Sequence, residues 1–192
     1  MPKQRITKEM IVDAAFEIAK TEGMEQVLIK NIAKKIGCSV QPVYTYCANM
    51  EGLRKEVEKK ACEVIRAFIE KHIVKEDLFH STGQAYVRLA KENPHLFRLF
   101  LLHKREGISS LDELLQSETN PAVAGFIADT FSISLEQAKQ LHLNLLIYTI
   151  GFGTIFASSE ICAEEIFSQQ EYAFKAFLKA SMDQRKENGH ET

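Results

Sequence analysis

The sequence predicts an all-α protein, and three observations support this class. Apolar residues recur at the three-to-four-residue spacing of a helix along most of the chain. Ser, Thr, Asp or Asn stands where most of these periodic segments begin, as expected of N-cap residues. No segment alternates apolar and polar residues long enough to suggest a half-buried strand. With 192 residues, the chain can form one larger domain, or a small domain joined to a medium one.

The N-terminal part of the chain contains three short predicted helices and then a long one. The short helices are expected over residues 7–23, 29–36 and 40–47. Their N-cap residues would be Thr7 and Ser39, and Gly23 and Gly37 would end the first two. Pro42 falls in the first turn of the third helix, where a missing N–H costs nothing. The long helix would begin after Asn49 and carry one apolar face as far as residue 68.

Six further helices are predicted in the rest of the chain. They are expected over residues 77–89, 93–102, 110–115, 120–131, 134–157 and 163–182. Two begin with Asn-Pro pairs, at Asn93 and Asn120, and two with capping boxes, at Ser110 and Ser134. The charged tail over 183–192 is expected to be frayed. We place a seam between residues 59 and 77, with no flexible linker, so the long fourth helix would join head and body rigidly.

Composition and charge exclude several kinds of protein. Apolar residues make up 45% and charged residues 26% of the chain, which is ordinary for a globular domain. The absence of an export signal and of a membrane-spanning segment favours a cytoplasmic location. The net charge is −2, but residues 1–60 hold eleven Lys or Arg against eight Asp or Glu. A mildly basic head on an acidic body suits DNA binding by the head.

The sequence contains no pattern typical of an enzyme or a metal site. Neither paired carboxylates in an apolar setting nor a nucleophile–base motif is present, so we expect no catalytic residues and no cofactor. The histidines and cysteines lack the spacing of metal ligands. Cys38 and Cys47 could act as redox sensors, but small apolar packing is the commoner role of a free cysteine.

Residues 29–48 carry the functional prediction. They read as a short helix, a glycine turn and a second short helix, which together form a helix-turn-helix. Such a unit exposes the second helix, which fits the major groove of DNA. Gln41 can pair with adenine, Thr45 can contact a base edge or a thymine methyl, and tyrosines can bond phosphates. The predicted DNA-binding residues are Lys8, Lys30, Ser39, Val40, Gln41, Pro42, Tyr44, Thr45, Tyr46 and Lys55. A purely structural helical hairpin is the plainer alternative.

In these residues the chain resembles the TetR family of bacterial regulators. The matching positions are Thr7, Ala14, Ala15, Gly23, Ile32, Ala33, Gly37, Ser39, Val43, Tyr44, Tyr46 and Leu53. The resemblance covers about residues 5–60, and the rest of the chain matches only by its number of helices. It implies a DNA-binding domain over residues 1–50 and a helical ligand-binding and dimerisation domain over 51–192. It also implies a homodimer bound to an inverted-repeat operator and released by a small-molecule effector that the sequence does not identify.

Three residues depart from the family pattern. Cys47 stands where Phe is usual, which leaves a smaller side chain in the core of the head. Met50 replaces a phosphate-binding Lys, so backbone N–H groups or Lys55 would have to substitute for it. Leu28 replaces a capping Thr, so the second helix would be less well capped.

The body offers candidate residues for a ligand pocket and a dimer interface. The pocket candidates are Tyr86, Phe97, Phe100, Leu101, His103, Phe126, Tyr148 and Phe152, with His142 as a further polar group. The interface candidates are Leu143, Leu146, Ile147, Ile150, Phe167, Phe174, Phe177 and Leu178. The alternative for both sets is ordinary core, with 135–157 as a central helix buried within one chain.

Three functions follow as hypotheses. The first is a ligand-released repressor, and the second is a transcriptional activator with the same head. The third is a helical small-molecule carrier or enzyme that retains a vestigial head. No sequence feature separates repressor from activator, whereas a carrier should keep its full biological effect when Gln41 and Tyr44 are replaced.

Overall fold

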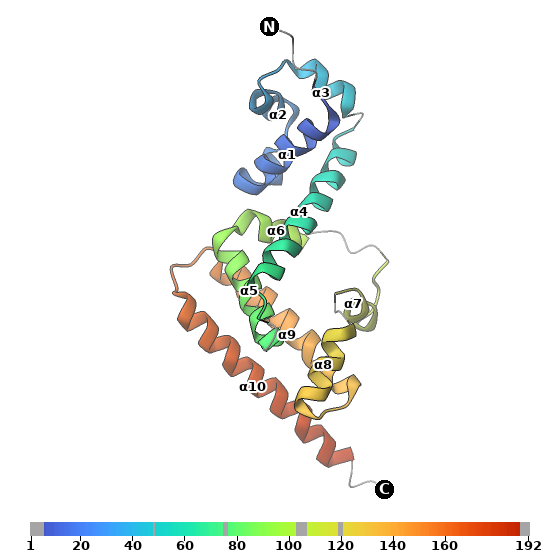
Figure 1. Ribbon diagram of the computed structural model, residues 1–192, viewed down its shortest axis with the longest axis vertical. Coiled ribbons are helices and arrows are strands. Elements are labelled where there is room, and N and C mark those ends of the chain that lie inside the picture. Colours follow the sequence, from blue (N-terminus) through green and yellow to red (C-terminus); the bar gives the residue numbers. More distant parts are fainter. Residues whose placement is uncertain (1–5, 48, 75–76, 103–106, 119–120, 189–192) are drawn as a thin grey trace. The chain divides into compact units, whose positions relative to one another are not determined.

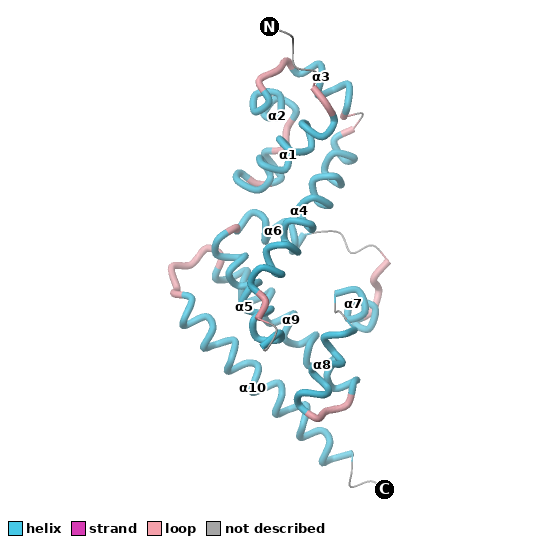
Figure 2. The backbone as a smooth tube through the Cα atoms, in the orientation of Figure 1, coloured by secondary structure: helices cyan, strands magenta, loops and turns pink. Residues whose placement is uncertain are grey.

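The computed structural model describes residues 6–47, 49–74, 77–102, 107–118 and 121–188. Every regular element in these ranges is a helix, and none of these residues forms a strand (Figures 1 and 2). The chain divides into two compact units: an N-terminal unit of residues 1–71 and 92–103, and a C-terminal unit of residues 72–91 and 104–192. None of the described helices combines the length and apolar character needed to cross a bilayer.

The N-terminal unit is a small helical domain with its own apolar core. Its helices are α1 (Lys8–Glu22), α2 (Ile29–Ile36), α3 (Val40–Tyr46), α4 (Met50–His72) and α6 (Pro94–Leu102). A 3-10 turn at Met24–Gln26, which the sequence analysis did not predict, joins α1 to α2. The fully buried side chains come from nearly every element and include Ile11, Ile18, Val27, Ile32, Val43, Val57, Leu96 and Phe97. This core holds α2 and α3 in place.

Local capping by a side chain explains where two of these helices begin, and two others begin without it. The Thr7 hydroxyl accepts the backbone N–H of Met10 at 3.3 Å, and the Asn49 Oδ1 accepts that of Gly52 at 2.6 Å. Leu28 supplies no side-chain cap to α2, as its apolar side chain predicts. Ser39 occupies the N-cap position of α3 but makes no side-chain cap hydrogen bond, so the expectation that its hydroxyl caps the helix is wrong.

The C-terminal unit contains α5 (Leu78–Glu92), α7 (Leu111–Glu118), α8 (Pro121–Phe131), α9 (Leu135–Phe156) and α10 (Ala163–Asn188). Helix α9 packs against both α8 and α10. The buried cluster between them is formed by Ile127, Ile133, Ala138, Leu141 and Phe174. Both predicted capping boxes are present, at the start of α7 and of α9. Helix α10 continues to Asn188, beyond the end predicted at residue 182.

Candidate DNA-binding surface and ligand cavity

Helix α3 is attached to the N-terminal unit by one buried side chain, has half-buried Pro42 in its first turn and exposes its other side chains to solvent. Val43 is fully buried, whereas Gln41 is exposed. Large side chains on α3 are also exposed, with 44% of Val40, 56% of Tyr44 and 42% of Tyr46 accessible. A group of large exposed side chains on one short helix is the kind of surface that can mark an interaction site. The helix therefore offers a row of hydrogen-bonding groups outward, as the sequence predicts.

The turn before α3 sets the direction of that helix. Gly37 has φ 79° and ψ 34°, the left-handed conformation that glycine adopts without strain. Its N–H donates to the carbonyl of Ala33 at 2.9 Å, and the N–H of Cys38 donates to the same carbonyl at 3.0 Å. An added Cβ would meet no atom within 4 Å, so the glycine is required by its backbone conformation and not by space.

Two polar groups on α3 suit contact with base edges. The hydroxyl of exposed Thr45 donates to the carbonyl of Gln41 at 3.0 Å, which leaves the hydroxyl oxygen available as an acceptor. The amide of Gln41 carries both a donor and an acceptor, the pair that adenine requires in the major groove. Helix α3 thus combines apolar and hydrogen-bonding groups on its exposed side.

The predicted phosphate-binding lysines differ in their surroundings. Lys30 on α2 is exposed and forms no ion pair with any described residue. Lys8 donates a hydrogen bond of 2.7 Å to Glu56 of α4, which raises the pKa of Lys8 and lowers that of Glu56. Lys55 lies 3.8 Å from Glu51 in an exposed pair. Of the three lysines, Lys30 is therefore the one most available to bind a phosphate group.

A cavity of about 240 Å³ adjoins the position where Cys47 replaces the usual aromatic residue. Tyr46, Asn49 and Leu53 also line it. Burial raises the pKa of the Cys47 thiol, which keeps it protonated and weakly nucleophilic near neutral pH. This environment favours the packing role of Cys47 over redox sensing.

The C-terminal unit contains a second cavity, with a volume of about 210 Å³, among α5, α8, α9 and α10. Of the predicted pocket residues, Tyr86 lines it, as does His142. Phe97 is a core residue of the N-terminal unit, to which Phe100 and Leu101 also belong, so these three do not line this cavity.

The other predicted pocket residues also lie elsewhere or cannot be placed. Tyr148 and Phe152 stack on one another with ring centroids 5.5 Å apart, and Phe126 is 38% exposed; none of the three lines the cavity. His103 lies outside the described residues.

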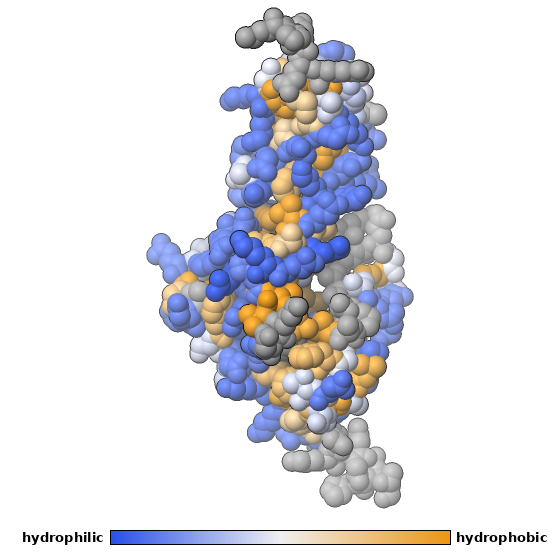
Figure 3. Space-filling model, in the orientation of Figure 1, coloured by the Kyte–Doolittle hydropathy of each residue, from blue (hydrophilic) through white to orange (hydrophobic). Residues whose placement is uncertain are grey.

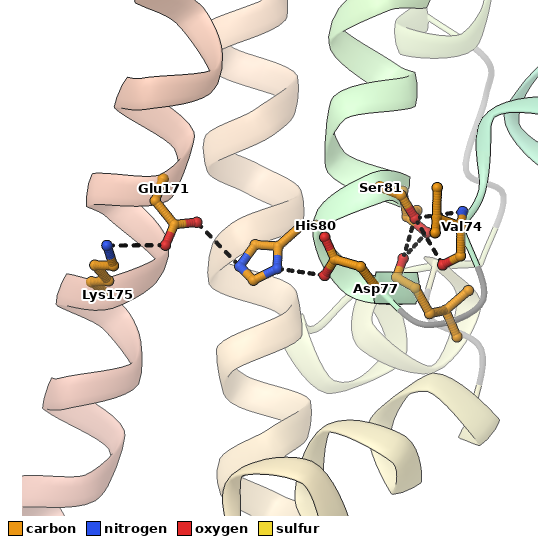
Figure 4. Close-up of polar contacts among 8 residues, drawn as sticks. Val74, Asp77, His80, Ser81, Glu171 and Lys175 are labelled. Carbon is orange, nitrogen blue, oxygen red and sulfur yellow. Dashed lines mark hydrogen bonds and ion pairs between the residues drawn. The ribbon is translucent and has the colours of Figure 1, made fainter.

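Polar residues that the sequence analysis missed line one side of this cavity. The Nδ1 of His80 lies 2.7 Å from the Oδ1 of Asp77, and its Nε2 lies 3.3 Å from the Oε2 of Glu171 on α10 (Figure 4). Glu171 also pairs with Lys175 at 3.1 Å. Gln170, next to Glu171, donates to the carbonyl of Gly83 at 3.2 Å. Among the described residues, no group of three or more His, Cys, Asp or Glu could hold a metal ion.

The predicted interface residues separate into three groups. Leu143 and Phe174 are buried within the chain, and Phe177 and Leu178 pack against the core cluster that contains Phe174. Leu146 and Phe167 line the cavity.

The third group lies on the surface of α9. Ile147 is 51% exposed. Ile155, which is not among the predicted interface residues, is 68% exposed on the same face, with exposed Gly151 between the two isoleucines. Ile150 is half-buried. In Figure 3 hydrophobic residues reach the visible surface of the C-terminal unit, whereas hydrophilic residues cover most of the visible N-terminal unit. The most exposed of the predicted interface residues thus lies on α9, whereas the predicted phenylalanines of α10 are buried or half-buried.

Comparisons with known proteins agree with this architecture. No family model matches the chain. The uncharacterized HTH-type transcriptional regulator YobS of Bacillus subtilis (strain 168) is 23% identical over 181 residues, 92% of this chain and 93% of YobS. A TetR-family transcriptional regulator from Streptomyces coelicolor matches with a TM-score of 0.68 at 14% identity, over 95% of this chain and 85% of that chain.

Two further solved structures share the arrangement of helices. A TetR-like transcriptional regulator from Rhodococcus sp. RHA1 has a TM-score of 0.64 at 12% identity, over 92% of this chain and 98% of that one. BioQ, solved with its double-stranded DNA operator, has a TM-score of 0.56 at 14% identity with the same coverage. These likenesses show that both units belong to one known fold.

Proposed function

We propose that this chain, which has the fold of the TetR-family transcriptional regulators, is itself a sequence-specific DNA-binding regulator of transcription. The observation that carries the proposal is the outward row of Gln41, Tyr44 and Thr45 on a helix anchored by buried Val43. A helix presented in this way enters the major groove with its polar side chains facing base edges. The proposed partner is double-stranded DNA, and the proposed location is the cytoplasm.

Phosphate contacts would come from the groups around α3. The hydroxyl groups of Tyr44 and Tyr46 and the ammonium group of Lys30 are exposed and can reach the DNA backbone. Lys34 and Lys35 add exposed positive charge on α2. These contacts fix the position of the protein on DNA, and the residues facing the bases determine sequence preference.

We further propose that the chain acts as a homodimer through α9. A single short helix reads few base pairs, whereas two copies can read half-sites about 34–36 Å apart. Ile147 and Ile155 form an exposed apolar face of α9, and Gly151 between them has no atom near its missing Cβ. A second copy of this face can approach closely at the glycine and bury the isoleucines.

The cavity in the C-terminal unit is the proposed effector site. Apolar side chains and several convergent polar groups, among them His142 and Gln170, line it, and this combination is typical of a small-molecule pocket. An effector that binds better to the free protein than to the DNA-bound form would release the operator, because a ligand shifts an equilibrium by its differential affinity. We propose repression as the outcome, with activation distinguished by where the operator lies relative to the promoter.

Selection from random double-stranded DNA tests the DNA-binding proposal. The full chain should enrich a short inverted repeat, and binding to it should weaken as salt is raised. The variant Gln41→Ala should bind the enriched site about 5- to 150-fold more weakly, from about 1–3 kcal/mol for one bidentate contact, and Tyr44→Phe should also weaken binding. Gln26→Ala, the same change in the 3-10 turn away from α3, should bind normally. Enrichment of no sequence, or equal binding by the two glutamine variants, would refute the proposal.

A further inference from the structure

The cavity in the C-terminal unit carries information about the chemistry of its ligand, and this inference deepens the effector role proposed above. Its apolar walls include Tyr86, Val123, Leu146, Phe167 and Phe174. Its volume of about 210 Å³ somewhat exceeds that of an engineered apolar cavity of about 150 Å³ that binds benzene. The site therefore suits a body of about one aromatic ring with a short substituent.

The charges of the lining disfavour an anionic ligand. Among the described residues that line the cavity there is no Lys or Arg, and Glu171 is the one carboxylate. Burial lowers the pKa of His142 to about 4, so this ring is neutral at physiological pH. The nearby cations are exposed side chains outside the lining: Lys175 pairs with Glu171, and Arg88 lies over the Phe167 ring. A carboxylate entering the cavity would lose its hydration and meet no Lys or Arg among the described lining residues, and the His80 ring already faces two carboxylates, Asp77 and Glu171.

The hydrogen bonding of Gln170 indicates which chemical group a ligand of this cavity should carry. Its Nε2 donates to the carbonyl of Gly83 at 3.2 Å and lies 3.5 Å from the hydroxyl oxygen of Thr149. Because a carbonyl can only accept, the contact with Gly83 settles which end of the amide is nitrogen. The Oε1 of Gln170 is then a buried acceptor with no hydrogen-bond partner among the described residues. Such a group is stabilised by an N–H or O–H donor.

We propose that the cavity binds a small, apolar-bodied compound that carries an N–H donor, an amine or an amide, and that it discriminates against acids. The N–H of the ligand donates to the Oε1 of Gln170. The body of the ligand packs against Phe167 and Phe174, and an ammonium head gains further stabilisation from Glu171 and from the ring faces.

Four probes of nearly equal size test this assignment on the full chain by isothermal titration calorimetry. They are 2-phenylethylamine, phenylacetamide, phenylacetate and ethylbenzene. The amine and the amide should each bind at least tenfold more tightly than phenylacetate and ethylbenzene. Phenylacetate binding as tightly as the amine, ethylbenzene matching both N–H probes, or no detectable binding of either N–H probe at millimolar concentration would overturn the proposal.

Variants of Gln170 then test the named contact. Gln170→Leu should weaken the amine and the amide by at least tenfold, whereas Gln169→Leu, the same change at the exposed neighbouring position, should leave both unchanged. Gln170→Glu keeps the side-chain shape and should raise the affinity for the amine relative to the amide. Equal affinities of the Gln170 and Gln169 variants, or an unchanged ratio in Gln170→Glu, would refute the contact.

These measurements use the protein without DNA, so their outcome is separate from that of the proposed regulatory function. Failure of the probes to bind would leave DNA recognition by α3 intact. Loss of DNA recognition with the probes still bound would instead indicate a small-molecule carrier. If the amine releases the enriched operator, measured by fluorescence anisotropy, then ligand binding in the cavity controls DNA binding.

Discussion

The Nζ of Lys8 lies 2.7 Å from the Oε1 of Glu56, so the first residue of α1 is tied to the second turn of α4. This pair neutralises a cation that the sequence assigns to phosphate binding. The carboxylate would repel a nearby phosphate as strongly as the ammonium group attracts it. The pair therefore lowers the net attraction of this part of the surface for DNA.

Replacement of Glu56 by Gln should release Lys8 for DNA. We expect tighter binding to the selected operator and a salt dependence steeper by about one phosphate contact, or about 0.9 in the slope of log K against log salt. Fluorescence anisotropy at several salt concentrations measures both. Glu63→Gln, further along α4 and exposed, serves as the control. Weaker or unchanged binding by the Glu56 variant would show that Lys8 does not reach phosphate.

Lys30→Ala should weaken binding to all DNA sequences by a similar factor. Lys30 is exposed on α2 and would neutralise a phosphate without contacting a base. We expect the salt slope to fall by about 1 while the ratio of specific to non-specific affinity stays the same. Lys179→Ala, an exposed lysine on α10, is the matched control. A selective loss of the specific complex would assign Lys30 to base recognition instead.

Cys47→Phe should stabilise the N-terminal unit. The phenyl ring would occupy the adjoining cavity of about 240 Å³ and bury apolar surface there. We expect a gain of about 0.5–2 kcal/mol in the free energy of unfolding, measured by urea denaturation. Cys62→Phe, at an exposed position of α4, should change stability by less than about 0.5 kcal/mol. A lower stability of the Cys47 variant would mean that the surrounding side chains cannot make room for the ring.

Ile147→Asp should dissociate the proposed dimer. A charge placed on the exposed face of α9 would be buried without a partner when two copies meet. Sedimentation velocity should show a monomer that keeps its helical content, and binding to an inverted repeat should fall at least tenfold, or about 1.4 kcal/mol. Leu111→Asp, on α7 and 68% exposed, should leave the dimer intact. A dimeric Ile147 variant would exclude this face.

The stability of the protein should fall between pH 6.5 and 4 because of His142. Burial lowers the pKa of this ring from 6.5 to about 4. The unfolded chain therefore binds more protons than the folded chain in this pH range. Protonation stabilises the unfolded state, so the free energy of unfolding falls as the pH falls. From pH 7 to 4.5 the loss should be about 2–3 kcal/mol.

Urea denaturation of the wild type and of His142→Gln at both pH values isolates this effect, since the carboxylates titrate alike in both proteins. The variant should lose about 2–3 kcal/mol less than the wild type over this range. An identical loss in the two proteins would show that His142 is not held neutral by burial.

The positions of the helices along the chain could be predicted from sequence because their determinants are local. The capping box of Ser134 and Gln137 lies within four residues, and the left-handed turn at Gly37 follows from one residue type. The exposure of α3 also followed, since a helix anchored by Val43 must present its other side to solvent. Local pattern was sufficient for the proposed DNA-binding surface.

The cavity and the exposed face of α9 depend on contacts between distant residues. Gln170 meets Gly83 across 87 positions, and no periodicity reveals such a pair. Phe174 lies on an apolar face that the pattern does identify, but the pattern does not say whether its own chain or a second copy covers it. In this structure the chain itself covers Phe174, which moves the proposed interface to the region around Ile147.

The contacts of the Gln170 amide offer a path by which ligand binding in the C-terminal unit could affect the rest of the chain. Its nitrogen meets the backbone of α5 at Gly83 and the side chain of α9 at Thr149, while its own backbone belongs to α10. A ligand that hydrogen-bonds to the oxygen of this amide would therefore act on a contact that three helices share. Helix α5 is joined through the single residue Asn93 to α6 of the other unit, so a displacement of α5 has a short covalent path to the unit that carries the proposed DNA-binding helix.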